Sequence, residues 1–514
     1  MSKTIIIIGA GLAGLSAALQ AAENGCNVKL VSSLPSERAQ SVMAEGGINA
    51  ALNTKDENDS PEEHFTDTIK AACGLADQNA VWGMTQAAPE LVHWLLKLGV
   101  KFNMSGYDDV DLRNFGGQKK KRTAFAQSDT GKQIMTAMID AVRRKEASGM
   151  VERFSHHSFL TLRLCGNICC GCVIRDEYSQ ETVELPGDAV IVATGGMHGL
   201  FGNTTGSLSN TGEVTAELFR LGVPLANGEM IQYHPTTVKC GGKRMLISEA
   251  ARGEGGRLFA MKDGKQWYFM EEKYPELGNL MPRDITAREI WKVSHESEVF
   301  LDMTEISDEI ISNKLSGLAD DCMTYLHKDI RKEPVSVLPG IHYFMGGILV
   351  DEQHRTPIQN LCAAGECCAQ YHGANRLGGN SLLGALYGGR VAAKSACEQA
   401  DVVDLSCATQ IDFPPASQIS EIKQLNKVMQ ETMGVVRNEN TLLNGIKTVQ
   451  ALTGNLPLLG MAVLKSALAR KESRGAHWRE DYPKSNDDDY LKTTVARFDG
   501  KQIQISFVPV PERR

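Results

Sequence analysis

One segment near the N-terminus constrains the fold more than any other part of the chain. Residues 5–8 are four consecutive isoleucines, a run typical of a strand that is buried on both faces. Gly9, Gly11 and Gly14 follow in a GxGxxG arrangement, and residues 15–31 read as a helix and then a second strand. In this order the glycines allow a tight turn, the close approach of a pyrophosphate and the close packing of helix on strand. The segment therefore predicts a doubly wound parallel sheet that binds a dinucleotide.

The motif by itself leaves the identity of the nucleotide open. The second strand ends at Ser32-Ser33, where an acidic residue would hold a ribose hydroxyl more strongly than serine does. Two later apolar segments, 189–193 and 361–364, run into Thr194-Gly195-Gly196 and Gly365-Glu366. We expect both to be strands of the same sheet, because small residues at strand ends let a cofactor lie across them.

The order of these segments predicts a discontinuous nucleotide domain. With 514 residues the chain is long enough for about three domains. We expect a Rossmann-like α/β domain at residues 1–225 and 346–405, with an α+β capping domain inserted at 226–345. Apolar residues recur every three or four positions after residue 419, so we expect residues 406–514 to form a helical C-terminal domain.

Charge and hydropathy argue against several classes of function. Asp and Glu outnumber Lys and Arg by 62 to 54, and this acidic balance gives no support for binding to nucleic acid. Apart from the N-terminal run that contains the glycine motif, no stretch of the sequence is apolar over the length of a transmembrane helix. We therefore expect contact with a membrane only through partner subunits. The 13 cysteines, an odd number, favour reduced thiols in a cytoplasmic, anaerobic setting.

A cluster of four cysteines, Cys165, Cys169, Cys170 and Cys172, has the ligand type of a zinc or iron–sulfur site. The cluster lies in an alternating segment with Gly166-Asn167 at a turn, which is typical of a β-hairpin. We therefore expect these cysteines to pack in a sheet, and we predict no metal site.

Polar residues concentrate in and after the inserted region. Taken singly, each has an ordinary structural role: His234 suits a hydrogen-bonded core histidine, and Glu249 with Arg252 suits a surface helix pair. Taken together, two histidines and three arginines in glycine-flanked apolar segments predict a site for a small dianion, since arginine binds carboxylates through two parallel hydrogen bonds. The residues of this predicted site are His234, Ser248, Glu249, Arg252, Arg283, His342 and Arg376.

These motifs make the chain resemble the flavoprotein subunits of fumarate reductase and succinate dehydrogenase, a family that also includes L-aspartate oxidase. Further matching stretches are 44–48, 115–117, 122–126 and 472–477. The resemblance implies FAD in the nucleotide domain and a substrate held between the flavin and the cap. The positions that it assigns to FAD are Gly9, Gly11, Leu12, Ala13, Gly14, Ser32, Ser41, Ala44, Glu45, Gly46, Gly47, Thr194, Gly195, Gly196, Glu366, Asn375, Arg376, Ser381 and Leu382.

The resemblance also implies roles at the predicted anion site. The positions that would bind the two carboxylates of fumarate or succinate are Gly47, His234, Ser248, His342 and Arg376. Arg283 stands at the family's proton donor, and Glu249 and Arg252 stand at its proton relay. Guanidinium releases a proton with difficulty, so this role requires another cation to crowd Arg283 and a relay to reload it.

Two departures from the family pattern bear on the function. Membrane-bound relatives attach FAD covalently to a histidine, and that position is Gln40 here, so we expect non-covalent FAD. In the family the covalent bond raises the flavin potential, and its absence favours fumarate reduction over succinate oxidation. The sequence after Pro483 departs from the family pattern, which leaves the docking of the usual iron–sulfur subunit open.

Three hypotheses about function follow. The first is a fumarate reductase flavoprotein subunit that receives electrons from an iron–sulfur partner, with succinate dehydrogenase as its oxidative counterpart. The second is L-aspartate oxidase of NAD biosynthesis, although residues 115–131 resemble the succinate-type enzymes more. The third is a flavin-binding scaffold without activity. Against it stands the joint retention of five polar residues of the predicted site, namely Glu249, Arg252, Arg283, His342 and Arg376.

Overall fold

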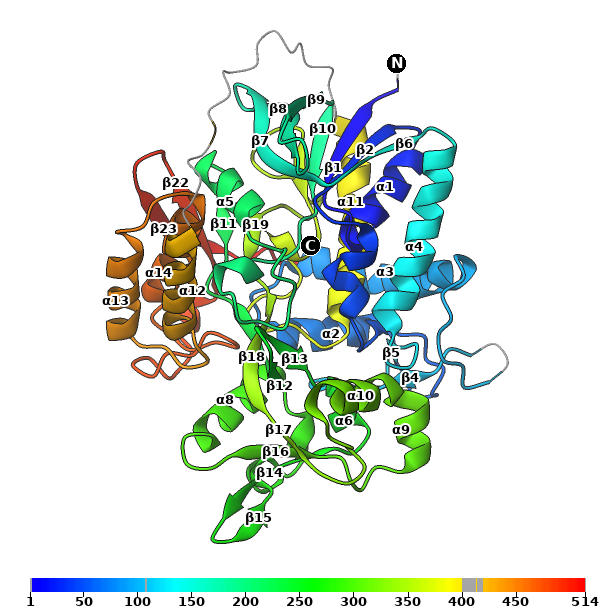
Figure 1. Ribbon diagram of the computed structural model, residues 1–514, viewed down its shortest axis with the longest axis vertical. Helices are drawn as coiled ribbons and strands as arrows, with labels where there is room; N and C mark the ends of the chain where they lie inside the picture. The colour runs from blue at the N-terminus through cyan, green and yellow to red at the C-terminus, as the bar shows by residue number, and fades with distance from the viewer. Residues whose placement is uncertain (1, 107–108, 400–412, 414–418, 514) are drawn as a thin grey trace.

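The predicted parallel sheet lies at the centre of the nucleotide-binding part of the molecule (Figure 1). The structure is a computed structural model and describes residues 2–106, 109–399, 413 and 419–513. The sheet has the strand order β20-β10-β1-β2-β6, and every neighbouring pair is parallel. Its strands are β1 (Thr4–Ile8), β2 (Asn27–Ser32), β6 (Val151–Ser155), β10 (Ala189–Val192) and β20 (Leu361–Ala363). The four strands expected from the sequence are thus confirmed, and β6 joins them at the edge.

The run of isoleucines is buried because both faces of this sheet are covered. Ile5 and Ile7 pack with the helices on one face, whereas Ile6 and Ile8 pack against an antiparallel sheet on the other. The helices of the first face are α1 (Leu12–Glu23), α3 (Gln78–Lys97), α4 (Thr130–Ala147) and α11 (Asn380–Gln399), and α2 (Pro61–Ala71) packs on α3. Helix α1 packs closely on α11 because its sequence is rich in alanine and glycine.

The second face is covered by the antiparallel sheet β7-β8-β9. Its strands are β7 (His157–Cys165), β8 (Ile168–Asp176) and β9 (Thr182–Pro186). Cys165 pairs with Ile168 across the turn, so the predicted hairpin is confirmed. Cys169 and Cys172 are buried between this hairpin and the central sheet. In the part of the chain that the structure describes, no group of three or more His, Cys, Asp or Glu side chains is arranged to hold a metal ion.

One cysteine differs from the expectation that all thiols are reduced. Cys165 is disulfide-bonded, whereas Cys26, Cys169, Cys172 and the other described cysteines are free. The expectation of uniformly reduced thiols rested on an odd cysteine count, and an odd count does not exclude a single pair.

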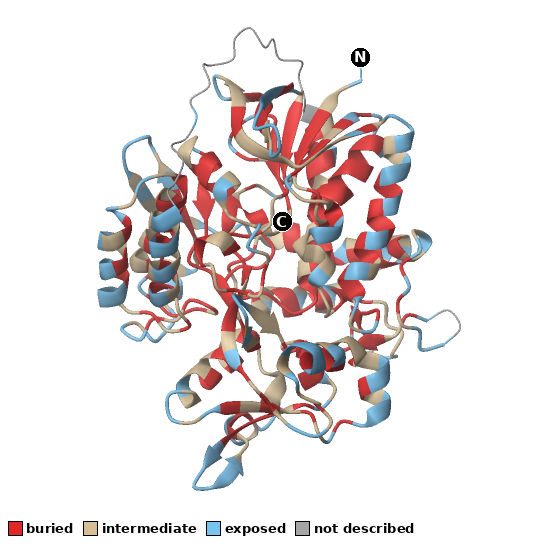
Figure 2. Cartoon of the chain, viewed as in Figure 1, coloured by how far each residue is buried: buried red, intermediate tan, exposed pale blue. Residues whose placement is uncertain are grey.

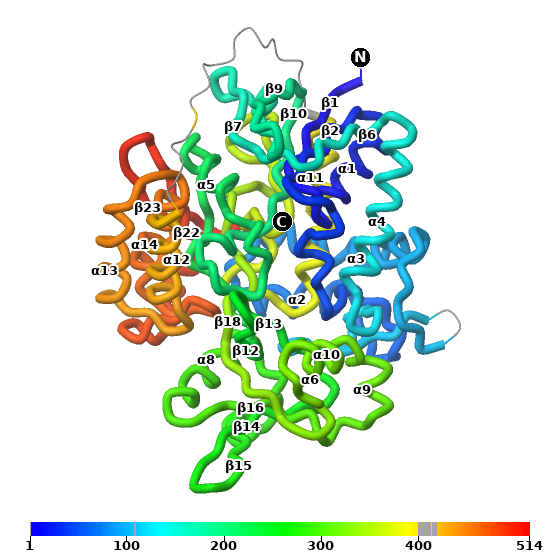
Figure 3. The backbone as a smooth tube through the Cα atoms, viewed as in Figure 1, coloured from blue at the N-terminus to red at the C-terminus, as the bar shows by residue number. Residues whose placement is uncertain are grey.

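The inserted region forms a separate layer at the foot of the view in Figure 3. It has its own cluster of buried side chains, which includes Leu258, Ile290 and Leu301. Its strands are β12 (Ile231–Cys240), β13 (Lys243–Leu246), β14 (Arg257–Lys262), β15 (Lys265–Trp267), β16 (Val299–Asp302), β17 (Val335–Ser336) and β18 (Leu338–Phe344). Its helices are α6 (Glu249–Gly253), α7 (Phe269–Lys273), α8 (Arg283–Val293), α9 (Asp308–Lys314) and α10 (Ser316–Asp321).

The C-terminal region is helical, as the apolar periodicity predicts, and it ends in a β-hairpin that the prediction of a helical domain does not include. Its helices are α12 (Ile419–Thr432), α13 (Glu439–Val449), α14 (Asn455–Ala469) and α15 (Asp487–Tyr490), and its strands are β22 (Lys492–Phe498) and β23 (Ile503–Pro509). The hairpin joins a second sheet of order β21-β19-β11-β22-β23, whose other strands are β11 (Leu225–Ala226), β19 (Gly347–Leu349) and β21 (Cys368–Ala369). The alternation of apolar side chains at Ile503, Ile505 and Phe507 carried a strand signal.

Burial follows these layers. Figure 2 shows buried residues along the central sheet and the inner faces of its helices, with exposed residues on the outer faces of α4, α9 and α13. Among the described helices, none has the length and apolar character needed to cross a membrane. The domain boundaries proposed from the sequence stay a prediction, and the boundary after residue 405 lies outside the described residues.

Candidate functional site

A cavity of about 730 Å³ connects the carboxyl ends of the central strands with the capping region. Ser32 and Gln40 line it on the nucleotide side, and Arg283 and His342 line it on the cap side. All the predicted site residues line this cavity except Gly14, Arg252 and Asn375. The dinucleotide site and the anion site predicted separately from the sequence therefore share one space.

Gly14 and Arg252 contact Gly9 and Glu249, which line the cavity, and Asn375 contacts the buried Gln232 beside it. A Cβ atom at Gly14 would lie 1.9 Å from the carbonyl oxygen at the start of the glycine turn, so only glycine allows α1 to pack there. The Asn375 side-chain oxygen accepts a hydrogen bond from Gln232 at 3.1 Å. Arg252 Nη2 donates to Glu249 at 3.2 Å.

The nucleotide side of the cavity fits a flavin dinucleotide. Helix α1 begins after Gly11 without a side-chain cap, and a Cβ atom at Gly11 would meet no backbone atom within 4 Å. Backbone amides at such a helix start attract a pyrophosphate. The Ser32 hydroxyl is buried and has no hydrogen-bond partner among the described residues, which suits a ribose hydroxyl.

A buried ion cluster forms the far end of the cavity. Glu249 Oε2 accepts hydrogen bonds from Arg283 Nε at 2.9 Å and from Arg283 Nη2 at 2.6 Å, while Glu249 Oε1 faces Arg252. Helix α6 places Glu249 and Arg252 three residues apart on one face, and α8 begins at Arg283. Burial raises the pKa of Glu249, but Arg283 and Arg252 outweigh it and hold this pKa below its ordinary value. The cluster is thus a carboxylate between two guanidinium groups.

Gln232 connects this cluster to the loop that carries Arg376. Its side-chain oxygen accepts from Arg283 Nη1 at 3.0 Å, and its amide nitrogen donates to the Arg376 carbonyl at 2.8 Å. Gln232 lies in β12 and is completely buried. The sequence does not predict this connecting role of Gln232, because the role depends on contacts between segments far apart along the chain.

His234 and His342 lie together at the same end of the cavity. Their ring centroids are 5.2 Å apart in an edge-to-face arrangement. His342 Nδ1 lies 2.8 Å from the Thr205 hydroxyl, while His234 Nε2 is buried without a hydrogen-bond partner among the described residues. Burial first, and then the Arg283 charge, lowers the pKa of both rings well below the ordinary value. Both histidines are therefore neutral at pH 7.

Arg376 completes the anion site. It is buried, and its guanidinium carbon lies 4.4 Å from the centroid of the Tyr343 ring. Burial, reinforced by Arg283, lowers the pKa of Arg376 to about 9, so this side chain is still cationic at pH 7. Two cationic arginines and two neutral histidines thus face one end of the cavity.

Ser248 and Glu45 meet where the cap approaches the nucleotide domain. The Ser248 hydroxyl caps α6 by accepting from the Ala250 amide at 3.4 Å. Burial, with Asp321 as the next cause, raises the pKa of Glu45 to about 8, and Glu45 Oε2 has no partner among the described residues. The sequence predicted Glu45 as a cofactor residue, but its protonation depends on burial that no local pattern reveals.

The fold and the cavity define an FAD-dependent oxidoreductase. The sequence matches the model of an FAD binding domain over residues 4–382 and that of the fumarate reductase flavoprotein C-terminal region over residues 452–513. The chain belongs to the succinate dehydrogenase and fumarate reductase flavoprotein family.

Relatives named as succinate dehydrogenases and relatives named as fumarate reductases are both similar to this chain over its whole length. The succinate dehydrogenase flavoprotein subunit of Bacillus subtilis is 38% identical, with 100% of this chain and 98% of that protein covered. The 8-methylmenaquinol:fumarate reductase flavoprotein subunit of Wolinella succinogenes is 32% identical, with 100% and 92% covered. A solved structure of a variant of Escherichia coli quinol fumarate reductase FrdA superimposes with a TM-score of 0.90 at 27% identity, with 100% and 97% covered.

The C-terminal match corrects one expectation. The prediction that the sequence after Pro483 departs from the family pattern is wrong, because the family model extends to residue 513. This segment forms β22 and β23, and a hairpin is specified by alternation of side chains rather than by a short motif of fixed residues.

Proposed function

We propose that the chain is the flavoprotein subunit of a fumarate reductase, with non-covalent FAD and with electrons supplied by an iron–sulfur partner subunit. The observation that carries the proposal is the buried cluster of Arg252, Glu249 and Arg283 at one end of the cavity. In this arrangement Arg283 can face a substrate, while Glu249 pairs with Arg283 and also with a second cation, Arg252.

The residues around the cluster suit a dicarboxylate such as fumarate. Arg376 supplies a buried positive charge that has no carboxylate partner among the described residues. His234 and His342 are neutral and offer ring nitrogens to carboxylate oxygens. Donors fixed in a buried site stabilise negative charge that develops during reduction, because no solvent has to reorganise.

The chain's own part in the chemistry is to deliver a proton. Bound FAD, once reduced by electrons from the partner subunit, would supply the hydride that reduces the alkene. Arg283 donates the proton to the other alkene carbon, and Glu249 and Arg252 return a proton to Arg283 through the contacts described above. Arg283 stands near two further cations, Arg252 and Arg376.

Gln40 supports the non-covalent and reductive parts of the proposal. It lines the cavity at the position where the family carries its attachment histidine, and an amide lacks a nucleophilic ring nitrogen.

Association with a membrane would run through partner subunits on the cytoplasmic side, because relatives are named as subunits of quinol-linked enzymes.

Two measurements on the purified protein test this proposal. After denaturation in acid we expect all FAD in the supernatant, and with dithionite-reduced viologen dye we expect rapid turnover of fumarate. Flavin that stays with the polypeptide would contradict non-covalent binding. Faster oxidation of succinate than reduction of fumarate would reverse the direction, and oxidation of aspartate to iminoaspartate would assign the protein to L-aspartate oxidase.

A further inference from the structure

Arg376 differs from the other arginines of the site in how it is held. Arg283 and Arg252 each bind Glu249, which fixes the positions of their guanidinium groups. Within the part of the chain that the structure describes, the Arg376 guanidinium has no carboxylate or hydrogen-bond partner, and its Nε is buried and unpaired. Some other contact must therefore fix the direction in which Arg376 points.

The contact that the structure offers is the face of the Tyr343 ring. Tyr343 lies in β18, next to His342, and the Arg376 guanidinium carbon stands 4.4 Å from the ring centroid. Both side chains are buried, and a desolvated cation over an aromatic face is attracted by the ring quadrupole. The orientation of the ring therefore influences the position of the guanidinium group.

His372 fixes the orientation of that ring from its edge. His372 Nε2 lies 3.2 Å from the Tyr343 hydroxyl, and the two rings meet edge to face with centroids 5.2 Å apart. Burial, and then the Arg376 charge, lowers the pKa of His372 well below its ordinary value, so His372 places no second charge beneath the arginine.

His372 and Arg376 are the two ends of one short loop. His372 contacts the edge of the Tyr343 ring and Arg376 contacts its face. The loop is itself held: Gly373 has a φ of +50°, and a Cβ atom there would lie 2.6 Å from the Ala72 carbonyl oxygen. The Ala374 amide donates to the same oxygen at 3.0 Å. Edge and face of the Tyr343 ring are thus contacted by a segment that cannot shift easily.

We propose that Tyr343 and His372 are positioning residues for Arg376, which hold its guanidinium in the direction that a substrate carboxylate requires. The inference rests on the proposed function, in which Arg376 binds one carboxylate of the substrate. It adds Tyr343 and His372 to the residues that the sequence predicts for the site.

The test uses variants that remove only the link between the two rings. Tyr343→Phe keeps the ring and loses the hydroxyl, and His372→Leu loses the ring nitrogen. We expect each to raise the KM for fumarate and the Kd for malonate, read from the flavin absorbance, by about three- to tenfold, as for the loss of one hydrogen bond. We expect kcat to change by less than about twofold, because Arg283 is untouched.

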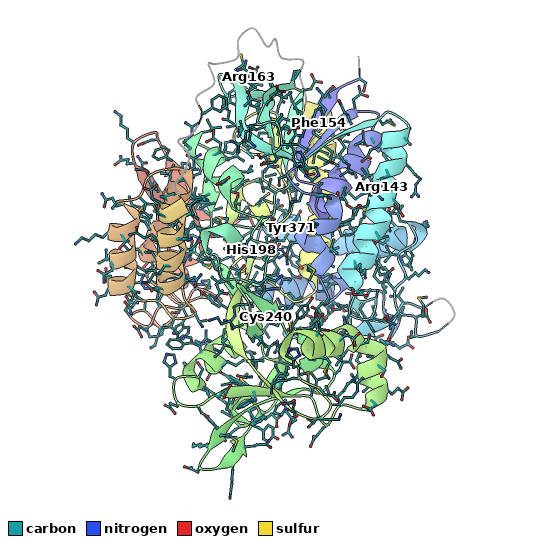
Figure 4. All side chains as sticks on the ribbon, in the orientation of Figure 1. Arg143, Phe154, Arg163, His198, Cys240 and Tyr371 are labelled. Carbon is teal, nitrogen blue, oxygen red and sulfur yellow. The ribbon has the colours of Figure 1, made fainter. Side chains whose placement is uncertain are left out.

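Three further variants separate positioning from a general structural effect. The double variant should equal either single variant, since both remove the same bond. His372→Gln should restore most of the affinity, because its amide can reach the hydroxyl. Tyr371→Phe, the control, removes a buried tyrosine–histidine bond of the same kind, to His354, next to this loop (Figure 4 labels Tyr371), and should leave the KM unchanged.

The outcomes distinguish this inference from the proposed function. FAD content and the visible spectrum are measured first, so that only fully loaded variants are compared. Unchanged KM and Kd in Tyr343→Phe and His372→Leu, a loss confined to kcat, or additive effects in the double variant would each overturn the inference alone. A wild-type protein that holds FAD but binds neither fumarate nor malonate would overturn the proposed function, and the inference with it.

Discussion

Burial and neighbouring charges set the charge state of each titratable side chain around the cavity end. The two histidines are neutral there, the Glu249 carboxylate is ionised, and Arg376 is a cation with a lowered pKa. Charge is thus concentrated on the arginines and on one carboxylate. In the proposed function the site binds a dianion and also passes a proton through Arg283, because the two tasks fall on different residues.

The role of Arg283 predicts a specific defect. Arg283→Gln removes the proposed proton donor but keeps a polar side chain, so we expect kcat for fumarate to fall by about 10²–10⁴-fold while FAD content stays at the wild-type level. Stopped-flow or steady-state assays with reduced viologen measure this. The control is Arg288→Gln on the same helix, whose guanidinium stacks 4.0 Å from the Trp478 ring centroid and which should retain near-normal turnover.

Glu45 predicts a pH dependence of stability. Its pKa is raised from 4.5 to about 8, so between these values the folded protein holds a proton that the unfolded chain has lost. The contribution of Glu45 to the free energy of unfolding therefore falls as pH rises through this window and is constant above it. Glu45→Gln, measured by urea unfolding of the FAD-free protein from pH 5 to 8.5, should gain stability relative to wild type as pH rises. If the stability of Glu45→Gln changed with pH as steeply as that of the wild type, this prediction would be contradicted. Glu37→Gln, at an exposed position, serves as the control.

At the scale of elements, the first helix of the nucleotide domain depends on close backbone approach. Gly14→Ala would place a Cβ atom 1.9 Å from the Gly9 carbonyl oxygen, so α1 must shift away from the glycine turn. We expect destabilisation of roughly 1–3 kcal/mol and weakened FAD binding, measured by thermal unfolding and by flavin content. Gly242→Ala, where a Cβ atom meets nothing within 4 Å, should change neither quantity.

At the scale of the whole molecule, a buried ion network ties the C-terminal region to the rest. Arg470 Nε donates to Glu229 at 2.7 Å, and Arg470 Nη1 donates to Glu472 at 2.8 Å, with all three side chains inaccessible to solvent. Glu229 lies just before β12, where the chain enters the cap. This network, with the pairing of β22 on β11, joins the C-terminal region to the segment that leads into the site.

Removal of one member of this network should be costly. Arg470→Met leaves Glu229 buried without its cation, whereas Glu472 keeps its pair with Arg474. We expect a loss of about 3–5 kcal/mol in the free energy of unfolding, measured with denaturant. Arg143→Met breaks an exposed pair with Glu37 on the outer face of α4 (Arg143 is labelled in Figure 4) and should cost less than about 1 kcal/mol. Equal losses of the free energy of unfolding in the two variants would show that the buried network stabilises the protein no more than the exposed pair does.

The sequence by itself determined the local elements and the resemblance to a family. The isoleucine run, the glycine turn after it and the hairpin around Gly166 are specified by short-range patterns, and the structure confirms each of them. The order of motifs along the chain also predicted FAD and the fold class, because such motifs are recognised without knowledge of their contacts.

Only the tertiary structure decided which of these residues act on one another. Glu249 meets Arg283 from 34 residues away, Gln232 meets the Arg376 carbonyl from 144 residues away, and β22 pairs with β11. Nor could the sequence reveal that Glu45 holds its proton near neutrality. Long-range pairing and desolvation depend on which surfaces are packed together, and that packing is a property of the folded molecule as a whole.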